Sequence, residues 1–295
     1  MRKPLSFAVL ALLSLTLVPA RCGAADAVAG TIAQPTARTL AVVPFYGPER
    51  MWQLYTPLID YLRRETGEAW ELKLYPNHEA LLAGICRGEV DVTLLGPAPL
   101  GMANRSCGAL PFLVPLGKDG KPAYHSMLLT TDPAVAAVAQ LRGKKVGFME
   151  GSTAAHVLPL QMLRDAGLER GTFEAVFFES QDRIMTALLG RQIAAAGVKE
   201  ALYRRFEKEP VRLLQTSEPL PNFSFCALPS QPPARRERFV AALLKLKPRE
   251  RAADARVVEG WDDEIRNGFV LPAPDFLPAV LTVADTARSL MHESR

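Results

Sequence analysis

A short loop that carries two hydroxyl groups, Gly151-Ser152-Thr153, is the first feature of the sequence that could bind a small molecule. It follows an apolar run at residues 146–149 and precedes a segment with helical periodicity, so we expect it to join a strand to a helix. Backbone N–H groups in a first helical turn lack partners within the helix, and the helix dipole favours negative charge there. The loop could therefore hold an anion such as phosphate, although either hydroxyl could instead cap the helix.

A histidine four residues after Ser152 allows a second interpretation. His156 would lie on the same helix face as Ser152, where the two could act as base and nucleophile. No Gly-x-Ser-x-Gly turn surrounds Ser152, which argues against a hydrolase. His78, His125 and His156 come from unrelated segments without the ligand spacing of a zinc site. We therefore predict no catalytic residue, no metal and no cofactor.

The composition predicts a globular protein without nucleic-acid partners. The chain has 295 residues, room for one large or two ordinary domains, and 48% of them are hydrophobic. Its 35 basic and 31 acidic residues leave a net charge of +4. This excess is too small and too scattered to indicate nucleic-acid binding.

The N-terminal residues are typical of a secretory signal peptide, which we place at residues 1–25. Arg2 and Lys3 precede an apolar run at residues 5–19, and small residues follow it. A retained membrane anchor is the alternative. Cys22 could indicate a lipid anchor, but Arg21 directly before it fits a lipoprotein cleavage site poorly. We therefore expect an exported, periplasmic protein.

Export changes how the cysteines are interpreted. Removal of the signal peptide would leave Cys86, Cys107 and Cys226, and a pair of cysteines in an oxidising compartment is usually bridged. Cys86 ends a helix-like segment, and Cys107 lies in what we expect to be a glycine-containing loop. We predict a disulfide between these two, with Cys226 as a buried apolar residue in the run "FSFCAL".

Strand and helix patterns alternate along the chain and predict an α/β protein of two lobes. A β-α-β-α-β order over residues 39–96 indicates parallel strands with crossover helices. The pattern restarts after Asp132-Pro133, and two strand-like crossings join the lobes near residues 124–131 and 215–228. We predict one lobe from residues 37–128 plus 225–295 and the other from 129–224. Such lobes form a ligand cleft and can close about the crossings.

Four segments of the chain resemble, in order and spacing, the periplasmic phosphate/phosphite/phosphonate-binding proteins of ABC transporters. They are "LAVVPFYGPERMWQLYTPLIDYLRRETG", "PNHEALLAGICRGEVDVTLLGPAP", "LRGKKVGFMEGSTAAHVLPLQML" and "WDDEIRNGF". The resemblance covers about residues 39–280. It implies a type II periplasmic-binding-protein fold that captures a small oxyanion between its lobes, without catalysis.

The resemblance also implies roles for individual residues. Members of the family grip phosphonate oxygens with a Ser-Thr-Ser run at a helix N-terminus, which Ser152, Thr153 and Ala154 match, with only the N–H remaining at Ala154. Glu200 resembles the acidic residue that meets a ligand amine. His78 stands where an aromatic residue is common and Gln181 where a histidine is common, so we expect donors but no aromatic walls. These departures leave an aminoalkyl phosphonate and a smaller oxyanion as alternative ligands.

Four further positions are candidates because they follow or form strands that should face the cleft. Tyr46 follows the first strand, and the carboxyl ends of parallel strands line ligand sites. Gly96 and Pro97 follow another strand, where glycine allows close approach to a ligand. His125 lies on the first crossing.

These features predict an exported, monomeric protein that binds a phosphonate, phosphite or phosphate ion for an ABC permease. The alternative that uses the same fold is a ligand-sensing periplasmic subunit that docks on a membrane sensor kinase or chemoreceptor.

Overall fold

The computed structural model describes residues 37–43 and 45–292, with side chains as far as Leu290. The predicted signal peptide at residues 1–25, including Cys22, lies outside the described residues. Within the described part of the chain, no helix is both long enough and apolar enough to cross a membrane.

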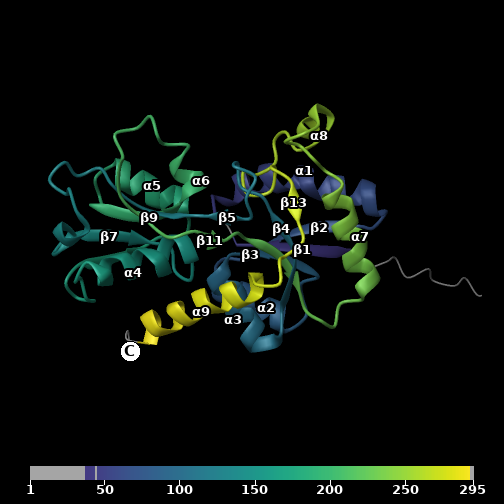
Figure 1. The fold of residues 1–295 in the computed structure, drawn as a ribbon, viewed down its shortest axis with the longest axis horizontal. Helices are drawn as coiled ribbons and strands as arrows, with labels where there is room; N and C mark the ends of the chain where they lie inside the picture. The colour runs from purple at the N-terminus through teal and green to yellow at the C-terminus, as the bar shows by residue number, and fades with distance from the viewer. Residues whose placement is uncertain (1–36, 44, 293–295) are drawn as a thin grey trace, which may run out of the picture. The chain divides into compact units, whose positions relative to one another are not determined.

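The first lobe is built on a six-stranded sheet with the order β13-β4-β12-β3-β1-β2 (Figure 1). Strand β1 lies between β2 and β3 and is parallel to both, as the predicted β-α-β-α-β order requires, and β12 is antiparallel to β3 and β4. The strands are β1 (Arg38–Val42), β2 (Trp70–Leu74), β3 (Val92–Leu95), β4 (Leu110–Pro115), β12 (Ser224–Ala227) and β13 (Phe269–Val270).

Helix α1 (Pro48–Thr66), which connects β1 to β2, shows how the local sequence sets the ends and the buried face of a helix. It starts with a proline, whose missing N–H costs nothing at that position, and Gly67 ends it in the left-handed region with φ of 67°. Met51, Tyr55 and Leu58 form its buried stripe. Trp52 lies beside that stripe and is 47% exposed.

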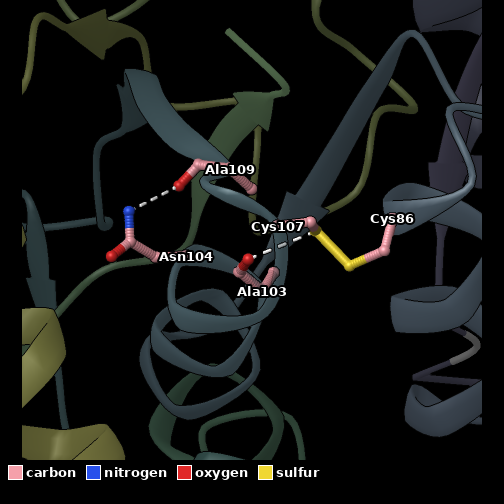
Figure 2. The surroundings of a disulfide bond; sticks show 5 residues. All are labelled: Cys86, Ala103, Asn104, Cys107 and Ala109. Atoms are coloured by element: carbon pink, nitrogen blue, oxygen red, sulfur yellow. Dashed lines mark hydrogen bonds between the residues drawn. A yellow bond between two sulfur atoms is a disulfide. The ribbon is translucent and has the colours of Figure 1, made fainter.

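Helices α2 (His78–Cys86) and α3 (Pro97–Cys107) are joined by the predicted disulfide between Cys86 and Cys107, with Cα atoms 5.3 Å apart (Figure 2). The side chain of Asn77 caps α2 by accepting the Ala80 N–H. The prediction of a loop around Cys107 is wrong, because Gly96 and Pro97 open a helix rather than a turn. Cys226 is fully buried, as expected.

The second lobe is built on a five-stranded sheet with the order β10-β6-β9-β7-β8. Its strand β7 is parallel to β8 and β9, whereas β6 is antiparallel to β9 and β10. The strands are β6 (Ser126–Thr130), β7 (Lys145–Phe148), β8 (Glu174–Phe177), β9 (Ala195–Lys199) and β10 (Arg212–Thr216).

The helical segments of the second lobe are shorter than their periodicity predicts. They are the 3-10 turn η1 (Val138–Leu141), the π-helical turn η2 (Thr153–Val157), α4 (Leu158–Asp165), α5 (Gln181–Leu189) and α6 (Glu200–Tyr203). The helical segment after Ser152 thus opens with a wide turn, and the helix that begins at Glu200 stops after four residues.

The chain crosses between the sheets twice, through the antiparallel pair β5 (Ala123–Tyr124) and β11 (Leu220–Pro221) (Figure 1). It then returns to the first sheet through β12, as predicted, and continues as α7 (Pro233–Leu244), α8 (Ala252–Val257), β13 and α9 (Phe276–His292). The lobe boundaries at 128/129 and 224/225 remain predictions.

Helix α9 packs along α3 and also contacts η2 and β11. A side chain at Gly101 of α3 would place its Cβ 2.3 Å from the Cβ of Ala284, so the glycine permits this close approach. Val280 belongs to a large apolar cluster that includes residues of both lobes, whereas Ala287 and Leu290 belong to a smaller cluster formed mainly by the second lobe.

Candidate functional site

The Ser152-Thr153 loop caps a helix and also presents groups toward the first lobe. The Ser152 Oγ accepts the Ala155 N–H at 3.1 Å, so the capping interpretation of this residue is correct. The wide first turn leaves the N–H groups of Thr153 and Ala154 without partners inside the helix. Ser152, Thr153 and Ala154 are all buried.

The N-terminus of α3 meets this loop directly. The Ala98 N–H, in the first turn of α3, donates to the Thr153 Oγ1 at 2.9 Å. Two helix N-termini, one from each lobe, therefore converge on the Thr153 hydroxyl, and both favour negative charge. Gly96 and Pro97, both predicted site residues, open α3 at this point.

Aromatic rings line the site, contrary to the expectation from sequence. The ring of Phe223 stacks on that of Phe45, with centroids 5.2 Å apart, and lies against Gly96. A Cβ at Gly96 would be 2.3 Å from the Phe223 ring, so only glycine fits there. Tyr124 packs beside Phe223 at 5.7 Å. These rings were not predicted because they come from segments far apart in the sequence.

His78 and Gln181 each form a hydrogen bond with a residue of the other lobe. The Nδ1 of His78 lies 2.9 Å from the carbonyl oxygen of Glu150, just before the hydroxyl loop. Burial lowers the pKa of His78 to about 4, so the ring is neutral at neutral pH. The Gln181 N–H donates to the Phe45 carbonyl at 3.1 Å.

The residue that sequence reasoning missed is Lys199, at the end of β9. Its Nζ donates to Asn222 Oδ1 at 2.9 Å and forms an ion pair with Glu264. It also lies 3.8 Å from the centroid of the Phe223 ring and 4.2 Å from that of Tyr124. Only 4% of Lys199 is exposed. Its position at the end of the apolar run "IAAAGV" is the signal that could have identified it.

Two predicted residues lie in a cavity of about 520 Å³ beside the crossing strands, which we call the crossing cavity. His125 Nδ1 lies 2.8 Å from the Ser217 carbonyl oxygen, and Glu200 is paired with Arg204. The cavity is lined by residues of both lobes: Leu116, Gly117, Lys118, Asp119, Lys121, Ala123, Tyr124, His125, Lys199, Glu200, Ala201, Arg204, Arg205, Pro219, Asn222, Asp263, Glu264, Arg266 and Asn267.

A buried acidic group lies behind this cavity. Asp262 is fully buried and accepts the Glu264 N–H with one carboxylate oxygen, while the other has no partner among the described residues. Burial and the nearby Glu264 charge raise the pKa of Asp262 from its ordinary 3.8 to about 7. Burial together with the Asp262 and Glu264 charges also raises the pKa of Tyr46, which packs under the Arg50 guanidinium.

The raised pKa of Asp262 predicts a specific dependence of stability on pH. The folded state binds this proton more tightly than the unfolded chain, so the stabilisation is complete below about pH 4 and is lost as the pH rises through about 7. Between pH 5 and 7 the free energy of unfolding should fall by about 1.4 kcal/mol per pH unit relative to that of Asp262→Asn. Urea unfolding across this range measures both profiles, and parallel profiles would contradict the assignment.

The structure brings Gly96, Pro97, Thr153 and Ala154 together in one place, with Ser152 capping the helix beside them. No hydrogen bond joins Ser152 to His156 within the described chain: the His156 Nδ1 instead accepts the Gly151 N–H at 3.3 Å. The roles of the predicted residues as ligand contacts stay predictions.

The two sheets, their two crossing strands and the site between them define a type II periplasmic-binding protein. A binding component of an ABC phosphonate transporter from Pseudomonas aeruginosa has a similar fold, with a TM-score of 0.76 and 14% identity over 88% of this chain and 89% of that one. PhnD1 from Prochlorococcus marinus, solved with methylphosphonate, gives a TM-score of 0.74 with 13% identity over 88% and 99% of the two chains.

The sequence establishes the family itself. Residues 40–275 match the family described as "ABC transporter, phosphonate, periplasmic substrate-binding protein", and the chain belongs to this family. The phosphate-import protein PhnD of Mycolicibacterium smegmatis is 27% identical over 168 residues, which are 55% of this chain and 52% of that protein. The chain thus spans about half the length of this curated relative. Relatives in this family are solute-binding transport proteins.

Proposed function

We propose that this protein captures a small phosphorus oxyanion in the periplasm and delivers it, as a monomer without enzymatic activity, to an ABC importer. The observation that carries the proposal is the convergence of two helix N-termini, one from each lobe, on the Thr153 hydroxyl. A tetrahedral anion between them would accept the N–H groups of Ala98, Thr153 and Ala154. Nothing in the described residues favours the sensing alternative.

The proposed binding cycle follows from the contacts at the loop. In the present structure the Thr153 Oγ1 accepts the Ala98 N–H, which excludes an anion from between them. The lobes would part at the crossing strands, the anion would enter, and closure would surround it with donors from both lobes. Only the closed form holds the two lobes in one fixed arrangement. The permease would recognise the ligand-bound protein by that arrangement.

A thermal-shift screen tests the proposal first. The panel holds phosphate, phosphite, methylphosphonate, 2-aminoethylphosphonate, sulfate and acetate. A ligand at ~100 times its dissociation constant should stabilise the protein by about 2.7 kcal/mol. A shift with sulfate or acetate alone, or with no anion at all, would contradict the proposal.

Two substitutions then test the site. Thr153→Val and Ser152→Ala should each weaken binding of the best anion by about 1–3 kcal/mol, the scale of hydrogen bonds to charged groups. Titration calorimetry measures the change, with Ser230→Ala, an exposed serine outside the cleft, as the matched control. Affinities equal to that of the control in both variants would disprove the site.

A further inference from the structure

The buried Lys199 ammonium has a partner that a ligand could replace. Lys199 and Glu264 come from different lobes, and both are buried, at 4% and 8% exposure. Burial lowers the pKa of Lys199, while the Glu264 charge acts in the opposite direction. Both residues line the crossing cavity, so the pair forms part of the wall of an existing space.

The crossing cavity carries an excess of positive charge around that pair. Six lysine and arginine residues line it against four acidic ones. Lys199 pairs with Glu264, Arg204 with Glu200 and Arg266 with Asp263, so three of the six cations have carboxylate partners. Lys118 and Lys121 form no ion pair with another described residue, and they leave the cavity with a net attraction for anions.

Two aromatic rings lie between the crossing cavity and the first turn of α3. The Tyr124 ring lies under the Lys199 ammonium at 4.2 Å and packs beside the Phe223 ring at 5.7 Å. The Phe223 ring lies 3.8 Å from the Lys199 Nζ and also contacts Gly96, the residue before α3. One aromatic ring therefore separates the Lys199 ammonium from the N-terminus of α3.

We infer that the ligand is a phosphonate with a second acidic group, such as a carboxylate, and that this group replaces Glu264 as the partner of Lys199. The inference rests on the proposed function. The phosphonate would occupy the two helix N-termini at Thr153, and the carboxylate would accept from the Lys199 ammonium. An aminoalkyl phosphonate would instead bring its ammonium group against Lys199, which repels it.

Calorimetry on the mature protein tests this inference by comparing phosphonates that carry a second acidic group with one that carries an amine. Phosphonoacetate or 3-phosphonopropionate should bind roughly tenfold more tightly than methylphosphonate, the contribution of about one charge-assisted hydrogen bond, and 2-aminoethylphosphonate should bind more weakly than methylphosphonate. Glu264→Gln removes the competing carboxylate and leaves Lys199 without its anionic partner until a ligand supplies one. This variant should bind the carboxyphosphonates roughly tenfold more tightly again, with a smaller change for methylphosphonate.

Glu65→Gln is the matched control, because Glu65 also pairs with a lysine, Lys245, but on the surface and outside the cleft. It should bind every ligand as the wild type does. Equal affinities for methylphosphonate and the carboxyphosphonates, or no selective gain in Glu264→Gln, would overturn the inference while leaving the proposed function intact. Failure of all phosphorus oxyanions to bind would instead overturn both.

Discussion

Replacing Lys199 by methionine is expected to lower the free energy of unfolding by about 3–5 kcal/mol, the cost of breaking a buried ion pair by removing one partner. Methionine fills a similar volume, so the loss would come mainly from charge. Glu264 would be left buried without its cation, beside Asp262, and the Asn222 amide oxygen would lose a donor. The cation that lies over the Phe223 and Tyr124 rings would also be removed.

Lys245→Met provides the control for this prediction, because Lys245 pairs with Glu65 at an exposed site. Exposed pairs contribute at most about 1 kcal/mol, so this variant should lose far less stability. The double variant Lys199→Met/Glu264→Gln should recover much of the loss, since no unpaired charge of that pair remains. Urea unfolding at pH 7 measures all four proteins. Equal losses for Lys199→Met and Lys245→Met would contradict the prediction.

Removal of the Cys86–Cys107 disulfide is expected to cost about 3 kcal/mol, because the bridge closes a loop between residues 21 positions apart and restricts the unfolded chain. The bridge also joins the ends of α2 and α3, and α3 presents Ala98 to the Thr153 loop. The double variant Cys86→Ser/Cys107→Ser should therefore unfold at lower urea concentration than the wild type.

The wild type treated with a reductant serves as the second arm of that experiment. Dithiothreitol should destabilise the wild type by a similar amount and leave the double variant unchanged, whereas the remaining thiol at Cys226 is buried and common to both. Two free thiols at Cys86 and Cys107 in protein purified under oxidising conditions would disprove the prediction.

Local patterns were enough to predict the architecture. Turn chemistry accounts for the end of α1 at Gly67 and for the cap of α2 at Asn77. Periodicity accounts for the parallel strands around β1 and for the return of the chain to the first sheet after the second crossing. The helix at Pro97 was missed because Gly-Pro-Ala-Pro has the composition of a turn, although a proline in a first helical turn is favourable.

The site was less predictable because its chemistry depends on contacts between distant segments. The hydroxyl loop could be identified from a contiguous motif. The Lys199–Glu264 pair joins residues 65 positions apart and the Phe45–Phe223 stack joins residues 178 positions apart, as the numbering shows. Only the folded chain reveals that His78 is held neutral by burial or that Phe223 takes the space that Gly96 leaves.

Helix α9 packs against both lobes, so the two lobes are not separate folding units. Its Val280 packs within a large apolar cluster that includes residues of both lobes, such as Leu40 and Ile184. Its Ala287 and Leu290 pack within a smaller cluster formed mainly by the second lobe. A fragment cut at the crossing strands would therefore leave apolar surface of the second lobe uncovered. We expect the two lobes to unfold together, because the larger cluster and α9 both connect the two sheets.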